Sequence, residues 1–174
     1  MEDQVILVDH NDQIVGEIGK MEAHTQGLLH RAFSIFIFNS KGELLLQQRA
    51  LNKYHSAGKW TNTCCSHPKP NEDTLKAAQR RLKEEMGMHC ELTYGFSFTY
   101  KALFTNGLIE HEFDHVFFGL SDELPVINHE EVVAFNYINL TNLTEDLKQN
   151  PDIYSAWLKV CFNKVIKFKN DNYE

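Results

Sequence analysis

The sequence has few cysteines and no long apolar run. Its 174 residues include only Cys64, Cys65, Cys90 and Cys161, without CxxC spacing, which argues against a disulfide scaffold, structural zinc and thioredoxin-like chemistry. No apolar run approaches the roughly 18 residues that span a bilayer, and the first segment is acidic where a signal peptide is basic. We therefore expect a soluble, cytoplasmic protein without a membrane partner.

Positive charge is also scarce. Lys and Arg number 17 against 24 Asp and Glu, so the formal net charge is −7. This balance disfavours nucleic acid as a partner, and an anionic substrate has to be held by a local group of cations. Repeats, charge blocks and Ser/Gly linkers are absent, which predicts a single domain over residues 1–174 and leaves the oligomeric state open. By contrast, nine histidines are many for this length and suggest metal binding or acid–base chemistry.

The pattern of apolar residues and turn signals predicts a mixture of strands and helices. Strands are expected at 5–9, 13–18, 32–39, 43–48, 60–64, 96–104, 108–119 and 132–138, and helices at 73–86, 142–149 and 155–168. We expect 32–39 and 43–48 to form a buried hairpin, and a second hairpin to close at residues 105–107. A three-residue loop there puts Tyr100 opposite Glu112. Because strands and helices do not alternate, the predicted fold class is α+β.

The helix expected at 73–86 carries charged residues that suit a metal-bound diphosphate. Together with Ser66 and Glu72, the sequence RRLKEEMGM at residues 80–88 resembles the Nudix box. Ser66 stands where the box has glycine, and Arg81 stands where it has its first glutamate. The carboxylates that remain, including Glu85, can hold magnesium against a diphosphate. The alternative is a solvated helix face with i,i+4 pairs such as Arg81 with Glu85.

Two adjacent cysteines lie in a long polar segment expected over 49–71. In the sequence TNTCCSHP, Cys65 lies two residues before His67, so the imidazole can activate the thiol or bind a metal beside it. The side chains of Cys64 and Cys65 point to opposite faces of an extended segment, so only one can enter a pocket. The alternative is a pair of small buried thiols, the more common fate of intracellular cysteine.

Two glutamates lie on one face of the strand expected at 108–119. Unpaired carboxylates of Glu110 and Glu112 would repel each other unless a cation lies between them, so a metal is the simplest explanation. The alternative is the exposed face of an edge strand, because Asp114 continues the same acidic row.

Three histidines add further metal-binding groups. His24 and His30 flank a possible turn at Gln26-Gly27, and alone each is more often a hydrogen-bonded or surface residue than a ligand. The combined set suits six-coordinate manganese, magnesium or iron better than tetrahedral zinc, and its members are His24, His30, His67, Glu110 and Glu112.

Six segments, taken in their order along the chain, are similar to those of type 1 isopentenyl diphosphate isomerases, which are relatives of the Nudix hydrolases. The matching segments are AHTxxxLHRAF at 23–33, QRAxxK at 48–53, GKWTNTCCSHP at 58–68, the altered box at 72–87, FxYKA at 98–102 and IEHEFDHVF at 109–117. The resemblance implies a Nudix-like mixed β-sheet sandwich flanked by helices. It also implies isomerisation of isopentenyl diphosphate to dimethylallyl diphosphate by metal-dependent protonation and deprotonation, a 1,3-allylic shift in isoprenoid biosynthesis.

The same resemblance implies roles for individual residues. Cys65 is expected to be a catalytic acid or base, Glu112 its partner across the substrate, and Tyr100 the residue that orients this glutamate. The ligands of the family's metal, taken as Mn²⁺ or another divalent ion, match His24, His30, His67, Glu110 and Glu112. Glu85 matches the ligand of a Mg²⁺ that arrives with the diphosphate. The substrate contacts match Lys20, Arg49, Lys53 and Arg81 around the diphosphate and Trp157 facing the carbocation.

Two other functions remain open at the level of sequence. One is a Nudix hydrolase of nucleoside diphosphate derivatives, although Arg81 replaces a carboxylate that such a hydrolase needs for its metal ions. The other is a catalytically silent protein that binds a diphosphate or a metal, in which Cys65 would be an inert thiol.

Overall fold

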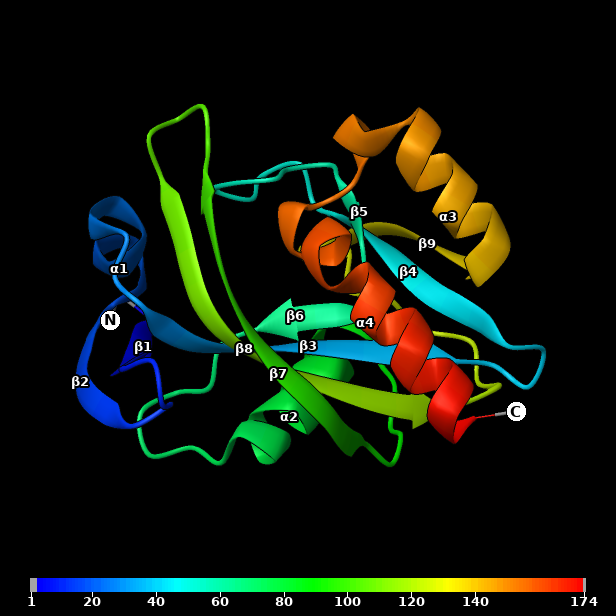
Figure 1. Cartoon of the computed structure of the whole chain (residues 1–174), viewed down its shortest axis with the longest axis horizontal. Coiled ribbons are helices and arrows are strands. Elements are labelled where there is room, and N and C mark those ends of the chain that lie inside the picture. Colours follow the sequence, from blue (N-terminus) through cyan, green and yellow to red (C-terminus); the bar gives the residue numbers. More distant parts are fainter. Residues whose placement is uncertain (1–2, 174) are drawn as a thin grey trace.

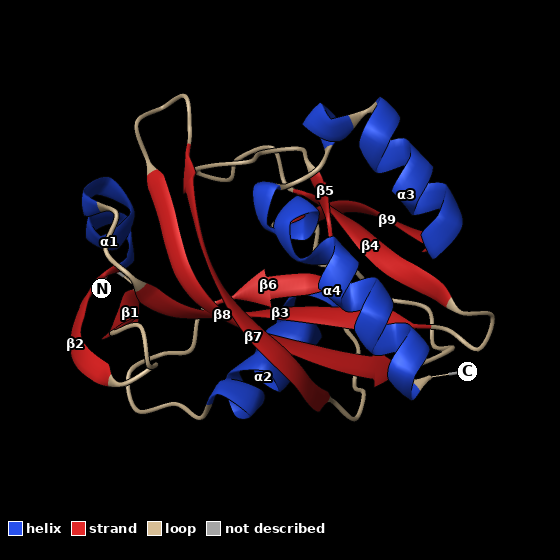
Figure 2. Ribbon diagram, viewed as in Figure 1, coloured by secondary structure: helices blue, strands red, loops and turns tan. Residues whose placement is uncertain are grey.

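The structure is a computed structural model that describes residues 3–173, and it consists of one mixed β-sheet with helices on both sides (Figure 1; Figure 2). Its elements in chain order are β1 (Gln4–Val8), β2 (Ile14–Gly19), α1 (Lys20–Gln26), β3 (His30–Phe38), β4 (Glu43–Arg49), β5 (Trp60–Thr61), β6 (Cys64–Ser66), α2 (Thr74–Met86), β7 (Thr93–Leu103), β8 (Ile109–Leu120), β9 (Val132–Asn139), α3 (Leu140–Gln149), a 3-10 turn (Pro151–Ile153) and α4 (Ala156–Asn172). Strands and helices do not alternate regularly, as expected for an α+β fold.

Strand β3 is the centre of the sheet. It pairs in parallel with β8 from His30↔Glu112 to Phe38↔Leu120, and antiparallel with β6 through Ser34↔Cys65 and its neighbours. On the far side of β8 lies β7, antiparallel, with Tyr100 directly opposite Glu112, so the predicted hairpin register is confirmed. These pairings bring β6 and β8, the strands with the candidate catalytic residues, to the two sides of β3.

Two hydrophobic cores cover the two faces of this sheet. Side chains of β3 alternate between them: Phe33, Ile35 and Ile37 pack toward α2, whereas Phe36 and Phe38 pack toward α3 and α4. All five are essentially inaccessible to solvent. Both sides of β3 are therefore buried, which explains its nearly continuous apolar sequence.

The hairpin expected from 32–39 and 43–48 separates soon after its turn. The single register pair between β3 and β4 is Phe38↔Leu44, and β4 then pairs along its whole length with β9. The strand expected at 60–64 is also two strands, because β5 pairs with β4 and β6 pairs with β3. These pairings could not be predicted, because the residue pattern of an apolar strand does not specify which strand it pairs with.

Helix α1 was not expected from the sequence, which indicated only a turn at Gln26-Gly27. The turn exists: Gly27 ends α1 with a φ of 66°, and a Cβ at this position would meet the side chain of Ile109 on β8. Seven residues are too few to show helical periodicity, so the pattern carried no signal for the helix. By docking beside β8, α1 brings His24 close to His30.

None of the helices in residues 3–173 combines the length and the apolar composition that crossing a membrane requires.

Candidate active site

A cavity of about 230 Å³ opens between the sheet, α2 and the first turn of α4. Most of the candidate residues line it, namely Lys20, Arg49, Lys53, Cys65, His67, Arg81, Glu85, Glu110, Glu112 and Trp157. Three others lie behind this wall: His24 and His30 are fully buried, and Tyr100 is 6% exposed. Residues from the first 20 positions to position 157 thus meet at one site.

Strand β6 decides which of the two cysteines faces the cavity. Cys64 is fully buried in the core beneath α2, whereas Cys65 lines the cavity and packs at the edge of the opposite core. The prediction that the two thiols point to opposite faces is confirmed. Burial raises the pKa of the Cys65 thiol, against the opposing charge of Arg49, so the group is a thiol and not a thiolate at neutral pH.

The polar residues before Cys65 form a buried network that fixes the strand. Thr63 Oγ1 donates to the carbonyl of Leu45 at 2.6 Å and accepts the amide of Ile37 at 2.9 Å. Asn62 Nδ2 donates to the carbonyl of Cys64 at 2.8 Å, and Asn62 Oδ1 accepts the indole N–H of Trp157 at 3.0 Å. The same motif therefore positions both the thiol and the indole.

Four residues bring potential ligand atoms within 4.8 Å of one another: His24, His30, His67 and Glu112. The Nε2 atoms of His30 and His67 lie 3.2 Å apart, and His67 Nε2 lies 2.9 Å from Glu112 Oε1. A second group joins Glu110 to His24 through His55. We call the five predicted ligands, His24, His30, His67, Glu110 and Glu112, the His/Glu cluster.

The two glutamates of the cluster are buried, not exposed. Glu110 and Glu112 are 4% and 5% exposed, and Asp114 is 1% exposed, because β8 lies between β3 and β7. The alternative of an exposed edge strand is therefore wrong. Asp114 instead accepts a hydrogen bond from Ser34 at 2.7 Å and does not continue toward the cavity.

The donor atoms of the cluster fit a divalent cation. His24 Nδ1 and His30 Nδ1 lie 2.7 Å and 2.8 Å from the carbonyls of Lys20 and Leu28, which fixes the proton on Nδ1 and leaves the Nε2 lone pairs free. His24 Nε2 and Glu110 Oε2 are buried without a hydrogen-bond partner. Burial lowers the pKa of His24 to about 4, which keeps its imidazole neutral as a metal ligand must be.

The carboxylates differ in their protonation. Burial and the neighbouring Glu112 raise the pKa of Glu110 well above its usual range. Burial acts in the same direction on Glu112, but the neighbouring imidazoles of His30 and His67 outweigh it and hold the pKa of Glu112 well below the usual range. Tyr100 donates its hydroxyl to Glu112 Oε2 at 2.7 Å. Glu112 is thus an ionised carboxylate, oriented on one oxygen by His67 and on the other by Tyr100.

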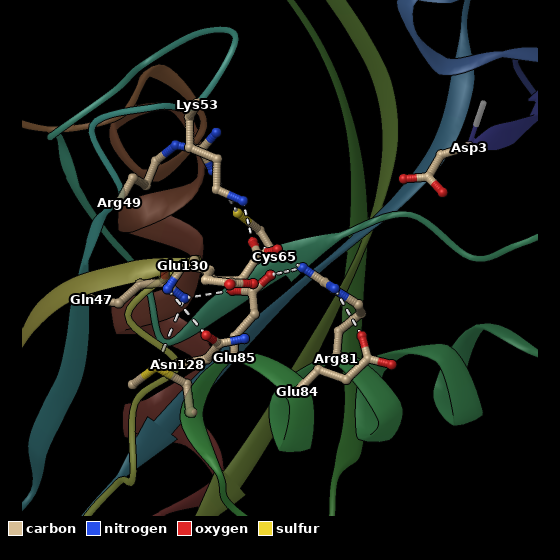
Figure 3. Close-up of polar contacts among 12 residues, drawn as sticks. Asp3, Gln47, Arg49, Lys53, Cys65, Arg81, Glu84, Glu85, Asn128 and Glu130 are labelled. Atoms are coloured by element: carbon tan, nitrogen blue, oxygen red, sulfur yellow. Dashed lines mark hydrogen bonds and ion pairs between the residues drawn. The ribbon is translucent and has the colours of Figure 1, made fainter. Parts of the chain in front are cut away.

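The four predicted diphosphate-binding cations line the same cavity. Figure 3 shows Arg49 and Lys53 entering from one side and Arg81 approaching from α2. Lys20 lies 3.3 Å from Asp3, Lys53 pairs with Glu131, and Arg81 lies 3.2 Å from the same Glu131 carboxylate. The Arg49 guanidinium is 5.2 Å from the Trp157 ring centroid, within cation–π range. We call Lys20, Arg49, Lys53 and Arg81 the cation group.

Glu85 lies at the base of the cation group. Its carboxylate accepts hydrogen bonds from Gln47 at 2.9 Å and from Arg81 at 2.5 Å (Figure 3). The i,i+4 pair of Arg81 with Glu85 expected for a solvated helix face is therefore formed, but Glu85 is only 5% exposed. The pair belongs to the cavity floor and not to a solvated surface.

Two cavity residues were missed by the sequence analysis. His55 is 5% exposed, and burial lowers its pKa to about 3. Glu131 pairs with Lys53 and Arg81. Neither occurs in a motif with ligand or catalytic spacing, so no sequence signal identified them. For His55, the only hint in the sequence is the high number of histidines, several of which lie outside the motifs.

Comparisons with known proteins relate the whole chain to a domain family and to named enzymes. The family model for the NUDIX domain matches residues 28–158. The chain is similar to isopentenyl-diphosphate Delta-isomerase 2 of Aromatoleum aromaticum, with 56% identity over 99% of this chain and 91% of the relative. It is also similar to isopentenyl-diphosphate Delta-isomerases of Pectobacterium atrosepticum, at 51% identity over 93% of this chain and 90% of the relative, and Photobacterium profundum, at 44% identity over 95% and 96%.

Solved structures support the fold. The protein DR0079 from Deinococcus radiodurans superposes with a TM-score of 0.76 at 18% identity, covering 92% of this chain and 98% of its own. The MutT protein from Methanosarcina mazei gives a TM-score of 0.67 at 19% identity, covering 84% and 96%. The α+β, Nudix-like architecture expected from the sequence is therefore confirmed.

Proposed function

Because this chain belongs to the type 1 isopentenyl-diphosphate isomerase family of the Nudix superfamily, we propose that the cavity is its active site. The reaction is the isomerisation of isopentenyl diphosphate to dimethylallyl diphosphate. One observation carries the assignment of the site: Cys65 and Glu112 come from strands on opposite sides of β3 and line the same cavity as the cation group. Proton-transfer groups and an anion site are thus combined in one small volume.

The cation group holds the diphosphate. Lys20, Arg49, Lys53 and Arg81 offer the charge that a chain of net charge −7 otherwise lacks. Glu85 would hold a Mg²⁺ that arrives with the diphosphate, because this ion prefers oxygen ligands, and the ion would offset part of the diphosphate charge. Binding energy from the diphosphate then positions the alkene beside Cys65 and Glu112.

Cys65 and Glu112 carry the proton transfers. Protonation at C4 of the alkene gives a tertiary cation at C3, and loss of a proton from C2 gives the product. The pair holds one transferable proton before substrate binds, because Cys65 is a thiol and Glu112 a carboxylate. When one group donates its proton and the other accepts one from C2, the proton count of the enzyme is unchanged.

Three residues protect or orient the reacting groups. Trp157 lines the cavity and offers a π face that favours the positive charge at C3. Tyr100 and His67 fix the two oxygens of Glu112. We propose that the His/Glu cluster holds Mn²⁺ or another divalent ion, which would favour the ionised form of Glu112.

Arg81 argues against the alternative function, hydrolysis of a nucleoside diphosphate derivative. Its guanidinium occupies the helix position next to Glu84 and Glu85 and pairs with both carboxylates, at 2.8 Å and 2.5 Å. Those carboxylates are then less available for the additional metal ions that hydrolysis of a phosphoanhydride needs.

The proposed reaction also bears on the compartment and the partners. Cys65 has to remain a reduced thiol, and a reducing compartment preserves it. We therefore propose a cytoplasmic enzyme whose partner is a small diphosphate and not a nucleic acid.

Turnover in deuterated water separates isomerase from hydrolase. With Mg²⁺ or Mn²⁺ present, isopentenyl diphosphate should be converted to dimethylallyl diphosphate with deuterium in a methyl group and without release of phosphate. Glu112→Gln should suppress this conversion. Phosphate released at a comparable rate would instead identify a hydrolase, and product without solvent deuterium in the first turnovers would exclude separate donor and acceptor groups.

A further inference from the structure

His55 lies in the segment between β4 and β5 and has no role in the reaction described above. Its imidazole stacks on Phe104 with ring centroids 4.6 Å apart and planes 5° apart. The ring edges of Tyr54 and Trp157 contact it at centroid distances of 4.4 Å and 6.0 Å. The ring of the adjacent Tyr54 and two rings from distant parts of the chain therefore fix the plane of this imidazole.

The surroundings of the His55 ring are compatible with the tautomer that two cluster histidines adopt. His55 Nδ1 lies 3.3 Å from the hydroxyl of Ser56. A proton on Nδ1 donated to this hydroxyl leaves the lone pair on Nε2, as the carbonyl contacts of His24 Nδ1 and His30 Nδ1 do for those rings. The Nε2 atom that remains points to the His/Glu cluster.

Three unsatisfied polar atoms meet at this point. His55 Nε2, His24 Nε2 and Glu110 Oε2 are each buried without a hydrogen-bond partner. His55, His24 and Glu110 nevertheless bring potential ligand atoms within 4.8 Å of one another, and His55 Nε2 is 3.4 Å from Glu110 Oε1. Burying a polar atom without a hydrogen-bond partner is unfavourable, so three such residues in one group of potential ligands indicate a missing shared partner.

We propose that His55 is a further protein ligand of the cation held by the His/Glu cluster. The two groups of potential ligand atoms share His24: one adds His30, His67 and Glu112, and the other adds His55 and Glu110. Together they would offer four imidazoles and two carboxylates to one ion. Such a nitrogen-rich set selects a first-row transition ion over Mg²⁺. This inference rests on the metal site of the proposed function but does not depend on the isomerase reaction.

Cobalt binding tests the proposal without using activity. Metal-free wild-type protein, His55→Gly, His67→Ala and the control His89→Ala, a substitution of an exposed histidine, are titrated with Co²⁺ while its visible absorption is followed. We expect His55→Gly and His67→Ala to weaken Co²⁺ binding by at least about 10- to 100-fold, and His89→Ala to leave it unchanged. Free imidazole should enter the space left in His55→Gly and restore the wild-type Co²⁺ spectrum.

The outcomes separate this inference from the proposed metal site. Weaker binding in His67→Ala together with unchanged affinity and spectrum in His55→Gly overturns the role of His55 and leaves the His/Glu cluster standing. Unchanged binding in both variants overturns both. X-ray absorption of the Co²⁺-loaded wild-type protein adds a measurement that needs no variant to fold: four imidazole ligands support the proposal, and three contradict it.

Discussion

The cation group and the His/Glu cluster, which form the two ends of the cavity, differ in whether their side chains already have partners. In the cation group, three of the four cations already have carboxylate partners: Lys20 with Asp3, Lys53 with Glu131, and Arg81 with Glu84, Glu85 and Glu131. At the other end, buried ligand atoms of the His/Glu cluster and His55 lack partners. At the first end, carboxylates already pair with three of the four cations, although Arg49 Nε and Arg81 Nε are buried without a hydrogen-bond partner. At the second end, a bound cation would remove the cost of burying His24 Nε2, His55 Nε2 and Glu110 Oε2 unpaired.

This contrast implies different roles for the two ligands. A diphosphate has to displace internal carboxylates, so its binding is weakened by competition and is readily reversible, as suits a substrate. A cation at the His/Glu cluster meets no such competitor and satisfies several buried groups together, as suits a resident cofactor. The catalytic pair links the two ends, because Glu112 belongs to the His/Glu cluster and the Cys65 sulfur lies 4.0 Å from the guanidinium of Arg49. Each end can still be altered separately.

Removal of the thiol between the two ends should have the largest effect. Cys65→Ala deletes a proton-transfer group, so we expect turnover to fall by at least about 10²- to 10⁴-fold. Cys64→Ala is the matched control because its thiol faces the core beneath α2, and it should cost about 1 kcal/mol of stability with little change in turnover. Turnover is measured with isopentenyl diphosphate, and stability by urea unfolding. An inactive Cys64→Ala and an active Cys65→Ala would exchange the proposed roles.

Substitutions in the His/Glu cluster should have the next largest effect, and they should change stability as well as activity. Glu110→Gln removes a charge that the His/Glu cluster offers to a cation, and we expect bound metal and activity to fall together while the fold persists. Chelation of the wild-type protein should lower its Tm, because a ligand that binds only the folded state stabilises it. Metal content is measured by elemental analysis, and Tm by calorimetry. Full metal content in both Glu110→Gln and His67→Ala would exclude the ligand assignment.

At the cation end, Arg49 is the most informative position because no carboxylate neutralises it. Its guanidinium donates to the carbonyl of His55 at 3.2 Å and lies against Trp157. Arg49→Ala should weaken isopentenyl diphosphate and inorganic pyrophosphate by similar factors of roughly 10- to 100-fold, the effect of losing charged hydrogen bonds worth about 1.5–3 kcal/mol. Calorimetric titration measures both affinities. If only the substrate were affected, Arg49 would contact the alkene end instead.

Arg31→Ala is the matched control for this comparison. Arg31 lies on β3 but binds Asp12 through Nε at 2.7 Å, and it does not line the cavity. This variant should lose some stability and retain both affinities. A similar weakening in Arg31→Ala would mean that any lost arginine disturbs the site.

The same contrast shows what the sequence reveals about such a site. Groups within one strand were predictable: the alternation of β8 places Glu110 and Glu112 together, that of β6 separates Cys64 from Cys65, and the hairpin loop sets Tyr100 opposite Glu112. The direct pairing of β3 with β8 was not predictable, because the pattern of an apolar strand does not specify its neighbour.

Groups that reach the site through loops carried still less signal. His55 comes from the segment before β5, and Glu131 from the segment before β9. Their functional positions depend on where the backbone of these loops runs, which neither composition nor periodicity records. The order of motifs along the chain identified the family, but only the folded chain identifies the partners of its cations.

The smallest expected effect tests whether internal carboxylates compete with the diphosphate. Glu131 pairs with both Lys53 and Arg81, and its side chain is 25% exposed, so each pair is partly screened. Glu131→Gln keeps the shape and removes the charge, which frees Lys53 and removes one of the three carboxylates that pair with Arg81. Pyrophosphate without added metal should then bind up to about fivefold more tightly, corresponding to about 1 kcal/mol for a partly exposed ion pair.

Glu130→Gln, at the exposed neighbouring position, removes the same charge from the chain and should change the affinity less. Weaker binding in Glu131→Gln would contradict competition, because it would mean that Glu131 holds Lys53 and Arg81 in the positions that the anion needs.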